Sequence, residues 1–406
     1  MPSTIAWLDT TTDQQRIARE MVSLFMQSES RDELGIAQIR DVLSNWLFPG
    51  TSVLQARARY FVLIPWCFQV AEARAERSRS KTVEQHARDV QREMIMTMKR
   101  DHSGESGLIG KDVGANIQTL PRDLFWTGLV TFGIRRSELY IPPAQRQGSG
   151  EATELAVRLP TMWDPNLPER PKDFPADVPH GLDMSSAEAQ WLSERMRTGR
   201  EETYLAHLLT LDPSLIAAAG QPWDVVTDTP FVALDHAHRF SWVMHGASLV
   251  YNLLVARRYA QTPDLNAIDA TELTERFEER IREWADTMSP NTDPRGWDFS
   301  AFQSAVDQRN QRISPRTWEF VRAWINLCAT LGPTEAAMSL EAADLIRKRE
   351  QRKGSKSRLG GNVRVLEAWG GASGDGALTF RWPVIRRLLL DINGGLGTQE
   401  VTSADT

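Results

Sequence analysis

One stretch of the chain, residues 234–259 (LDHAHRFSWVMHGASLVYNLLVARRY), combines a largely apolar composition with a regular polar pattern. Five polar side chains recur along it at spacings of three, four, three and four residues: His238, Ser241, His245, Ser248 and Asn252. This spacing places all five on one face of a helix. The stripe has two explanations: a buried network that hydrogen-bonds to neighbouring helices, or the lining of a cavity that holds a ligand or water. Satisfied buried polar groups are the ordinary condition.

The stripe does not match a known catalytic motif. Ser248 lies near His245, but a serine nucleophile needs an exposed oxygen at a sharp turn and an oxyanion hole of free amides, which the middle of a helix does not supply. His236 and His238 diverge on a helix, and no His-Glu-x-x-His pattern accompanies them. The residue pairs of phospholipase-D-type and nuclease-type sites are also missing from the sequence. We therefore expect no metal site and no cofactor, and favour a non-enzymatic protein.

A second candidate site is the basic run at residues 346–358 (IRKREQRKGSKSR). Seven cations face the single carboxylate Glu350 in this run: Arg347, Lys348, Arg349, Arg352, Lys353, Lys356 and Arg358. Such a cluster at the end of a helix could bind the phosphates of nucleic acid and would make that binding salt-dependent. Cations at a helix C-terminus also favour the macrodipole, and exposed loops are often basic. Both interpretations stay open.

The elements that must position these groups are helices. Helical spacing of apolar residues recurs through the chain, including residues 36–46, 205–211, 234–259, 271–288, 315–331 and 334–349, and no strand-like alternation of any length competes. The expected fold is mainly α and multi-helical. Eight prolines fall between residues 142 and 179, which is typical of a linker or a loop wrapped on the surface. The predicted organisation is an N-terminal helical domain (1–141), a proline-rich segment (142–182) and a C-terminal helical domain (183–406).

The segment at residues 48–68 (FPGTSVLQARARYFVLIPWCF) is the most unusual part of the N-terminal half. A helix is predicted to begin at Ser52, with Thr51 as its N-cap, and Pro65 is predicted to kink or end it. Arg57 and Arg59 are embedded in this apolar stretch, which costs free energy unless they are paired. Because they point about 200° apart on a helix, each is expected to have its own internal partner.

Composition limits the class of protein. The 406 residues are 41% hydrophobic and 25% charged, which is the balance of an ordinary soluble globular protein, and most of the fourteen tryptophans are expected to anchor packing. The net charge of −6 argues against wholesale coating by nucleic acid, so any polyanion site must be regional. With only Cys67 and Cys328, no disulfide framework or thiolate zinc site is expected, and a reducing cytoplasm is the natural compartment. The sequence contains no run of about 18 apolar residues, so no membrane-spanning helix is predicted.

Five stretches together carry a resemblance that covers nearly the whole chain: the opening WLD, PGTSVLQARARYFVLIPW, IGKDVGANIQTLPRDLFWTGL, HGASLVYNLL and FRWPVIRRLLLDI. They resemble an uncharacterised bacterial family, carried as a domain of unknown function. The resemblance implies a genomic context, because members of that family often lie beside helicase-like and phospholipase-D-like proteins in phage-defence islands. It implies no activity and no catalytic residue.

The sequence leaves three alternative functions open. The first is a cytoplasmic, non-enzymatic accessory subunit of an anti-phage defence or DNA-processing system, which binds other proteins of that system and has nucleic acid as a further candidate partner. The second is an enzyme of unfamiliar type, with a pocket lined by the stripe from His238 to Asn252. The third is a purely structural scaffold.

Overall fold

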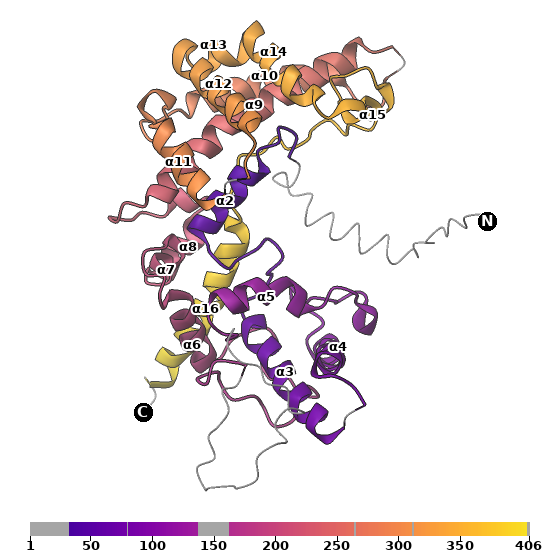
Figure 1. Cartoon of the computed structure of the whole chain (residues 1–406), viewed down its shortest axis with the longest axis vertical. Coiled ribbons are helices and arrows are strands. Elements are labelled where there is room, and N and C mark those ends of the chain that lie inside the picture. The colour runs from indigo at the N-terminus through magenta and orange to yellow at the C-terminus, as the bar shows by residue number, and fades with distance from the viewer. Residues whose placement is uncertain (1–31, 79, 137–161, 264, 311, 404–406) are drawn as a thin grey trace, which may run out of the picture. The chain divides into compact units, whose positions relative to one another are not determined.

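The computed structural model describes residues 32–78, 80–136, 162–263, 265–310 and 312–403, the last six by their backbone alone. Over these residues the chain forms fifteen α-helices, and the β-structure is limited to one antiparallel bridge between Arg135 and Trp163 (Figure 1). The prediction of a mainly α, multi-helical fold is confirmed.

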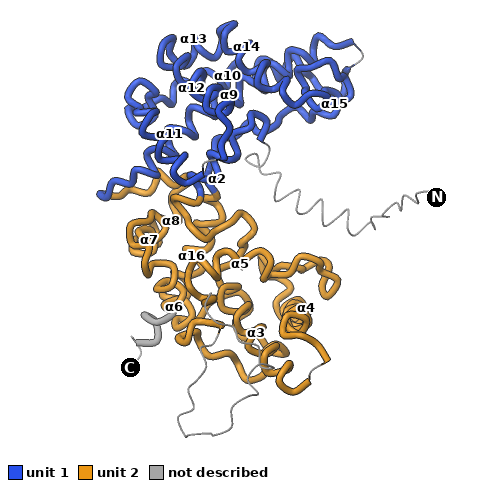
Figure 2. The backbone as a smooth tube through the Cα atoms, in the orientation of Figure 1, with its two compact units in different colours: residues 1–44, 228–380 blue, residues 45–227, 381–406 orange. Residues whose placement is uncertain are grey.

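Two compact units divide the chain, and each contains segments that are distant in sequence (Figure 2). Unit 1 comprises Met1–Ser44 and Asp228–Phe380, and unit 2 comprises Asn45–Thr227 and Arg381–Thr406. The partition predicted at 1–141, 142–182 and 183–406 uses segments that are continuous in sequence, whereas each of these units is discontinuous. The described part of the proline-rich segment lies within unit 2. Proline content marks an irregular stretch, but it does not reveal which distant segments pack together.

Unit 2 is built on two helix pairs. Helices α3 (Tyr60–Arg77) and α4 (Val83–Asp101) pack side by side, with α5 (Pro121–Thr131) against α3. The C-terminal helix α16 (Trp382–Ser403) packs against α6 (Ser186–Arg197) and contacts α8 (Pro213–Ala218). The remaining elements are α7 (Tyr204–Leu208) and the short 3₁₀ turns η2 (Gly114–Asn116) and η4 (Pro222–Asp224).

Unit 1 is built around the 30-residue helix α9 (Val232–Gln261), which carries the polar stripe. Helix α10 (Ala270–Asp286) packs most extensively against α9, and α12 (Pro315–Leu331), α13 (Pro333–Met338), α14 (Leu340–Gln351) and α15 (Val363–Glu367) also contact it. The other elements are α11 (Phe299–Arg309), η5 (Pro294–Gly296), η6 (Gly354–Lys356) and α2 (Ala37–Leu47), which begins in this unit. The single helix predicted at residues 334–349 is two helices, because Ser339 breaks the run and caps α14 through its side chain.

Three stacked tryptophans join α9 to its neighbours. The ring centroids of Trp242 and Trp284 are 4.7 Å apart, and those of Trp284 and Trp324 are 6.4 Å apart. The indole N–H groups of Trp284 and Trp324 each donate to a carbonyl of α9 at 2.8 Å. Gly246 makes this approach feasible, because a Cβ there would lie 2.2 Å from the Trp284 ring. All three indoles are buried, as expected for residues that anchor packing.

The segment before α3 differs from its prediction. Helix α3 begins at Tyr60 rather than Ser52, and the Thr51 hydroxyl donates to the carbonyl of Phe48 at 2.7 Å instead of capping a helix. Pro65 does not end the helix, which continues to Arg77. The residues around Pro65 are almost all buried, so tertiary packing outweighs the single backbone hydrogen bond that proline removes.

Arg57 and Arg59 each have their own internal partners, as predicted. The Arg57 Nε donates to both carboxylate oxygens of Asp391 at 3.0 and 2.9 Å, and its NH2 group donates to Asp183 at 2.8 Å. Arg59 donates to Glu188 at 2.9 to 3.3 Å. Asp391 lies on α16 and Glu188 on α6, so these buried pairs hold both helices against the start of α3.

Candidate functional site

The polar face of α9 is covered by the backbone of residues 373–378 in the same unit. The Ser241 hydroxyl donates to a carbonyl there at 2.8 Å, and the His245 Nε2 lies 3.1 Å from another. Asn252 donates to the segment at 3.0 Å and accepts from it at 2.8 Å. Burial, together with the nearby Arg280 guanidinium, lowers the pKa of His245 to about 4, so this ring is neutral at physiological pH. These bonds are those of a packing network.

Little space remains beside the stripe. Met244, His245 and Ser248 line a cavity of about 20 Å³ together with residues 32–36 and 374–378. That volume holds about one water molecule. The fifth stripe residue, His238, is half-buried. The described geometry thus favours the packing network over a ligand cavity.

Three cations of the basic run turn inward. Arg349 donates to the carbonyls of Leu34 and Gly35 at 2.7 and 2.9 Å, and Lys353 and Arg358 both bind the Glu33 carboxylate. These contacts fix the chain before α2 onto the region around α14, within unit 1. The inward cations are therefore structural.

Glu33 is the centre of this inner cluster. Its carboxylate also accepts from the Ser373 hydroxyl at 2.5 Å, and the Arg358 guanidinium bridges it to the Tyr251 hydroxyl at 2.7 Å. Burial alone would raise the pKa of Glu33, but hydrogen bonds from Lys353, Ser373 and Arg358 outweigh it and lower the pKa to about 2. Glu33 is ionised at every physiological pH.

Glu350, the single carboxylate of the basic run, also forms its hydrogen bonds inside the unit. It is fully buried and accepts from the backbone amides of Arg358 and Leu359 at 2.7 and 3.1 Å and from the Ser357 hydroxyl. Its role is to hold the loop that follows α14, so it does not neutralise the exposed cations.

Four cations of the run turn outward: Arg347, Lys348, Arg352 and Lys356. Lys348 pairs with Asp344 at 2.7 Å. Arg347, Arg352 and Lys356 make no ion pair or hydrogen bond with any side chain in the described parts of the chain. Lys348 and Arg352 are four residues apart and follow one face at the C-terminal end of α14, whereas Ile346 and Glu350 on the other face are buried. We call these four residues the outer cations.

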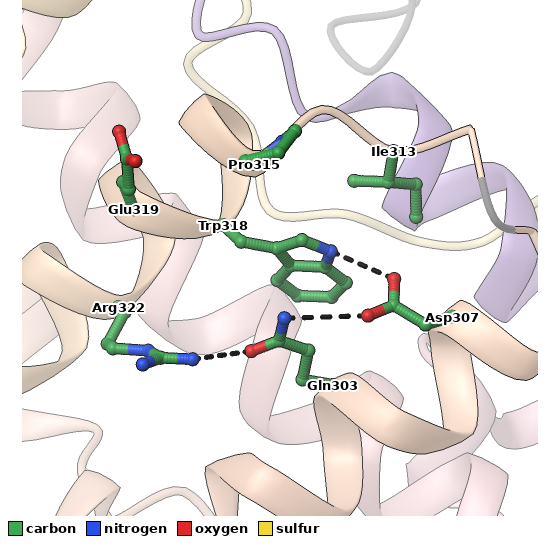
Figure 3. A pocket seen from close by; sticks show the side chains of 7 residues that line it. All are labelled: Gln303, Asp307, Ile313, Pro315, Trp318, Glu319 and Arg322. Atoms are coloured by element: carbon green, nitrogen blue, oxygen red, sulfur yellow. Dashed lines mark hydrogen bonds between the residues drawn. The ribbon is translucent and has the colours of Figure 1, made fainter.

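A pocket of about 510 Å³ lies between α11 and α12 (Figure 3). Asp307 accepts from the Trp318 indole at 2.9 Å and from Gln303 at 3.4 Å, and Gln303 in turn accepts from Arg322 at 2.6 Å. Ile313 completes an apolar edge. The polar groups mostly satisfy one another, so the arrangement fixes the two helices.

The sequence interpretation missed this pocket. Gln303 and Asp307 are four residues apart on one helix, as are Trp318 and Arg322 on the next, so each pair is visible as a helical face. Their meeting across two helices is a tertiary contact that no spacing in the sequence reveals.

The described residues offer no site for metal binding or for a reactive thiol. They contain no cluster of three or more His, Cys, Asp or Glu side chains arranged to hold a metal ion. Cys67 and Cys328 are both buried, and burial raises the pKa of each thiol, that of Cys328 to about 12, which disfavours the reactive thiolate. Within the same residues, no helix has the length and apolar character needed to cross a membrane.

Fold and side chains together define an all-helical protein of two units, with a polar network inside unit 1 and a set of exposed cations on it. The chain belongs to a family of unknown function (DUF6361), whose match covers residues 2–395. Searches of curated proteins and of solved structures found no match.

Proposed function

We propose that this chain is a non-enzymatic, cytoplasmic accessory subunit of a bacterial anti-phage defence or DNA-processing system, which binds other proteins of that system and contacts nucleic acid through the outer cations. The observation that carries the nucleic-acid contact is the division of the basic run. Arg349, Lys353 and Arg358 are used inside the unit, whereas Arg347, Arg352 and Lys356 are exposed and unpaired among the described residues.

This arrangement suits phosphate contacts better than base recognition. Guanidinium and ammonium groups bind phosphate oxygens through charge-assisted hydrogen bonds. No aromatic side chain alternates with the cations along residues 346–358, so base stacking has no platform there. The expected binding is independent of sequence and strongly salt-dependent. Three or four phosphate contacts by the outer cations alone contribute about −3 to the slope of log K against log salt.

The alternative, an enzyme whose pocket is lined by the stripe from His238 to Asn252, has weaker support. Ser241, His245 and Asn252 already bond to the backbone of residues 373–378. The remaining cavity of about 20 Å³ has no room for a substrate.

Duplex binding by the full chain tests the proposal. The variant Arg347→Ala/Arg352→Ala removes two outer cations, and the matched control Arg276→Ala/Arg282→Ala removes two exposed charges from α10 of the same unit. Fluorescence anisotropy with a labelled duplex of about 20 base pairs should show a salt slope shallower by about 2 for the first variant and the wild-type slope for the control. Absence of duplex binding by the wild type, or equal slopes for both variants, contradicts the proposal.

A further inference from the structure

The C-terminal end of α3 and the first half of α4 form an open groove in unit 2. Its volume is about 640 Å³, and its lining is rich in cations, among them Arg77 and Arg92. Its lining residues come from α3, from α4 and from the described residues Ser78 and Lys81 between them, so the groove belongs to one helical hairpin.

The two carboxylates that line the groove are already paired. Glu93 accepts from Arg74 through two hydrogen bonds of 2.7 Å, and Asp89 accepts from Lys81 at 2.6 Å. Each pair is neutral, so the lining groups left to act on a ligand are cationic.

Those groups are Arg77, which is exposed, and Arg92, which is half-buried. Neither forms an ion pair within the described residues, and the Nε2 atom of His86, which also lines the groove, is buried there without a hydrogen-bond partner. A guanidinium that is partly removed from water without a counter-ion costs free energy, and an anion in the groove would offset that cost.

The helix macrodipole explains only one of the two unpaired arginines. A cation at the C-terminus of a helix is favoured by the dipole, which accounts for Arg77 at the end of α3. Arg92 lies in the middle of α4, more than two turns from either end, where the dipole has little effect.

We propose that this groove binds the phosphodiester backbone of nucleic acid and gives unit 2 a phosphate-contacting surface of its own. Two arginines offer paired N–H donors that match phosphate oxygens. The groove is open rather than enclosed, so a continuous strand fits it better than a small molecule that needs burial on most sides. No Phe, Tyr or Trp side chain is among its lining residues, which indicates backbone contact without base stacking.

The inference rests on the proposed function, and it is tested with the full chain and the same labelled duplex. Arg77→Ala/Arg92→Ala should weaken binding by about tenfold near 100 mM salt and make the salt slope shallower by about 2. The control Lys172→Ala/Arg197→Ala removes two exposed charges elsewhere in unit 2 and should bind as the wild type does. Arg77→Lys/Arg92→Lys keeps the charge and should keep the wild-type slope. Circular dichroism should show unchanged helix content for all three.

The outcomes separate the two claims. If the variant Arg77→Ala/Arg92→Ala binds the duplex as tightly as the wild type, the groove is not a phosphate-binding surface. If only Arg347→Ala/Arg352→Ala then loses affinity, the proposed function still stands. A loss confined to the groove variant supports the groove and contradicts the outer cations as the contact surface. If the wild type does not bind the duplex, both fail. Competition by AMP at about micromolar concentration also overturns the assignment to a strand, because a single phosphate cannot release several counter-ions.

Discussion

Replacing Glu33 by Gln should remove a pH-dependent part of the stability of unit 1. The side chain of Glu33 is 14% exposed and binds Lys353 and Arg358 as ion pairs. Its pKa falls from 4.5 to about 2 on folding. A difference of about 2.5 pKa units corresponds to about 3 kcal/mol of unfolding free energy.

The direction of the pH dependence of stability follows from the lowered pKa of Glu33. Stabilisation by the Glu33 carboxylate is complete above pH 4.5, the unfolded pKa, and is lost as the pH falls through about 2. The Gln variant should therefore be less stable than the wild type by about 3 kcal/mol at pH 7 and by less than half that amount at about pH 3.

Urea unfolding followed by tryptophan fluorescence at both pH values measures this difference. Glu335→Gln is the matched control, because Glu335 is an exposed carboxylate of the same unit and should change stability by less than about 0.5 kcal/mol at either pH. A Glu33→Gln deficit that is equal at the two pH values would refute the reasoning, since the effect would then not depend on the carboxylate charge.

Two further predictions concern packing. Arg57→Ala should lower the unfolding free energy by about 3 to 5 kcal/mol, because it leaves Asp391 buried without its main partner. Arg387 also contacts this carboxylate, but its side chain is 45% exposed, so Arg387→Ala should cost about 1 kcal/mol or less. Similar losses for the two variants in urea unfolding would contradict the pairing. Gly246→Ala should cost about 1 to 3 kcal/mol in the same assay, because the new Cβ meets the Trp284 ring, and a variant as stable as the wild type would show that this contact is looser than the structure has it.

The sequence was sufficient for the periodic parts of the fold. The spacing from His238 to Asn252 correctly placed five polar groups on one face of a long helix, and the pairing of Arg57 and Arg59 followed from the cost of burying unpaired charge. That each has its own partner was inferred from their divergence on a helix, but α3 begins only at Tyr60, so their separation has another cause. Both inferences depend on local geometry or on a general energetic rule. Neither requires knowledge of which distant segment supplies the partner.

The errors arose where a distant segment decides the structure. The backbone that satisfies Asn252 comes from Ser373, 121 residues later, and the carboxylate that holds Arg358 comes from Glu33, 325 residues earlier. The irregular start before α3 likewise depends on Asp391, which accepts from the Ala58 amide. Spacing along the chain carries no information about such contacts.

The basic run shows the same limit in the candidate site. Its composition identified seven cations, and their division into inward and outward sets follows from the packing of α14 and from Glu33. The outer cations could have been suspected from the face opposite Ile346. That Arg347, Arg352 and Lys356 lack partners among the described residues, whereas Lys348 pairs with Asp344, could not have been.

The most direct test of this division compares Arg349→Ala with Arg347→Ala/Arg352→Ala in two assays, thermal unfolding and duplex binding. Arg349 donates to the carbonyls of Leu34 and Gly35, so its loss should cost about 1 to 3 kcal/mol of stability and leave the affinity for duplex near that of the wild type. The double variant should keep the wild-type melting temperature and lose affinity. The reverse pattern, in which Arg349→Ala weakens binding and the double variant lowers stability, would contradict the division on which the proposed function depends.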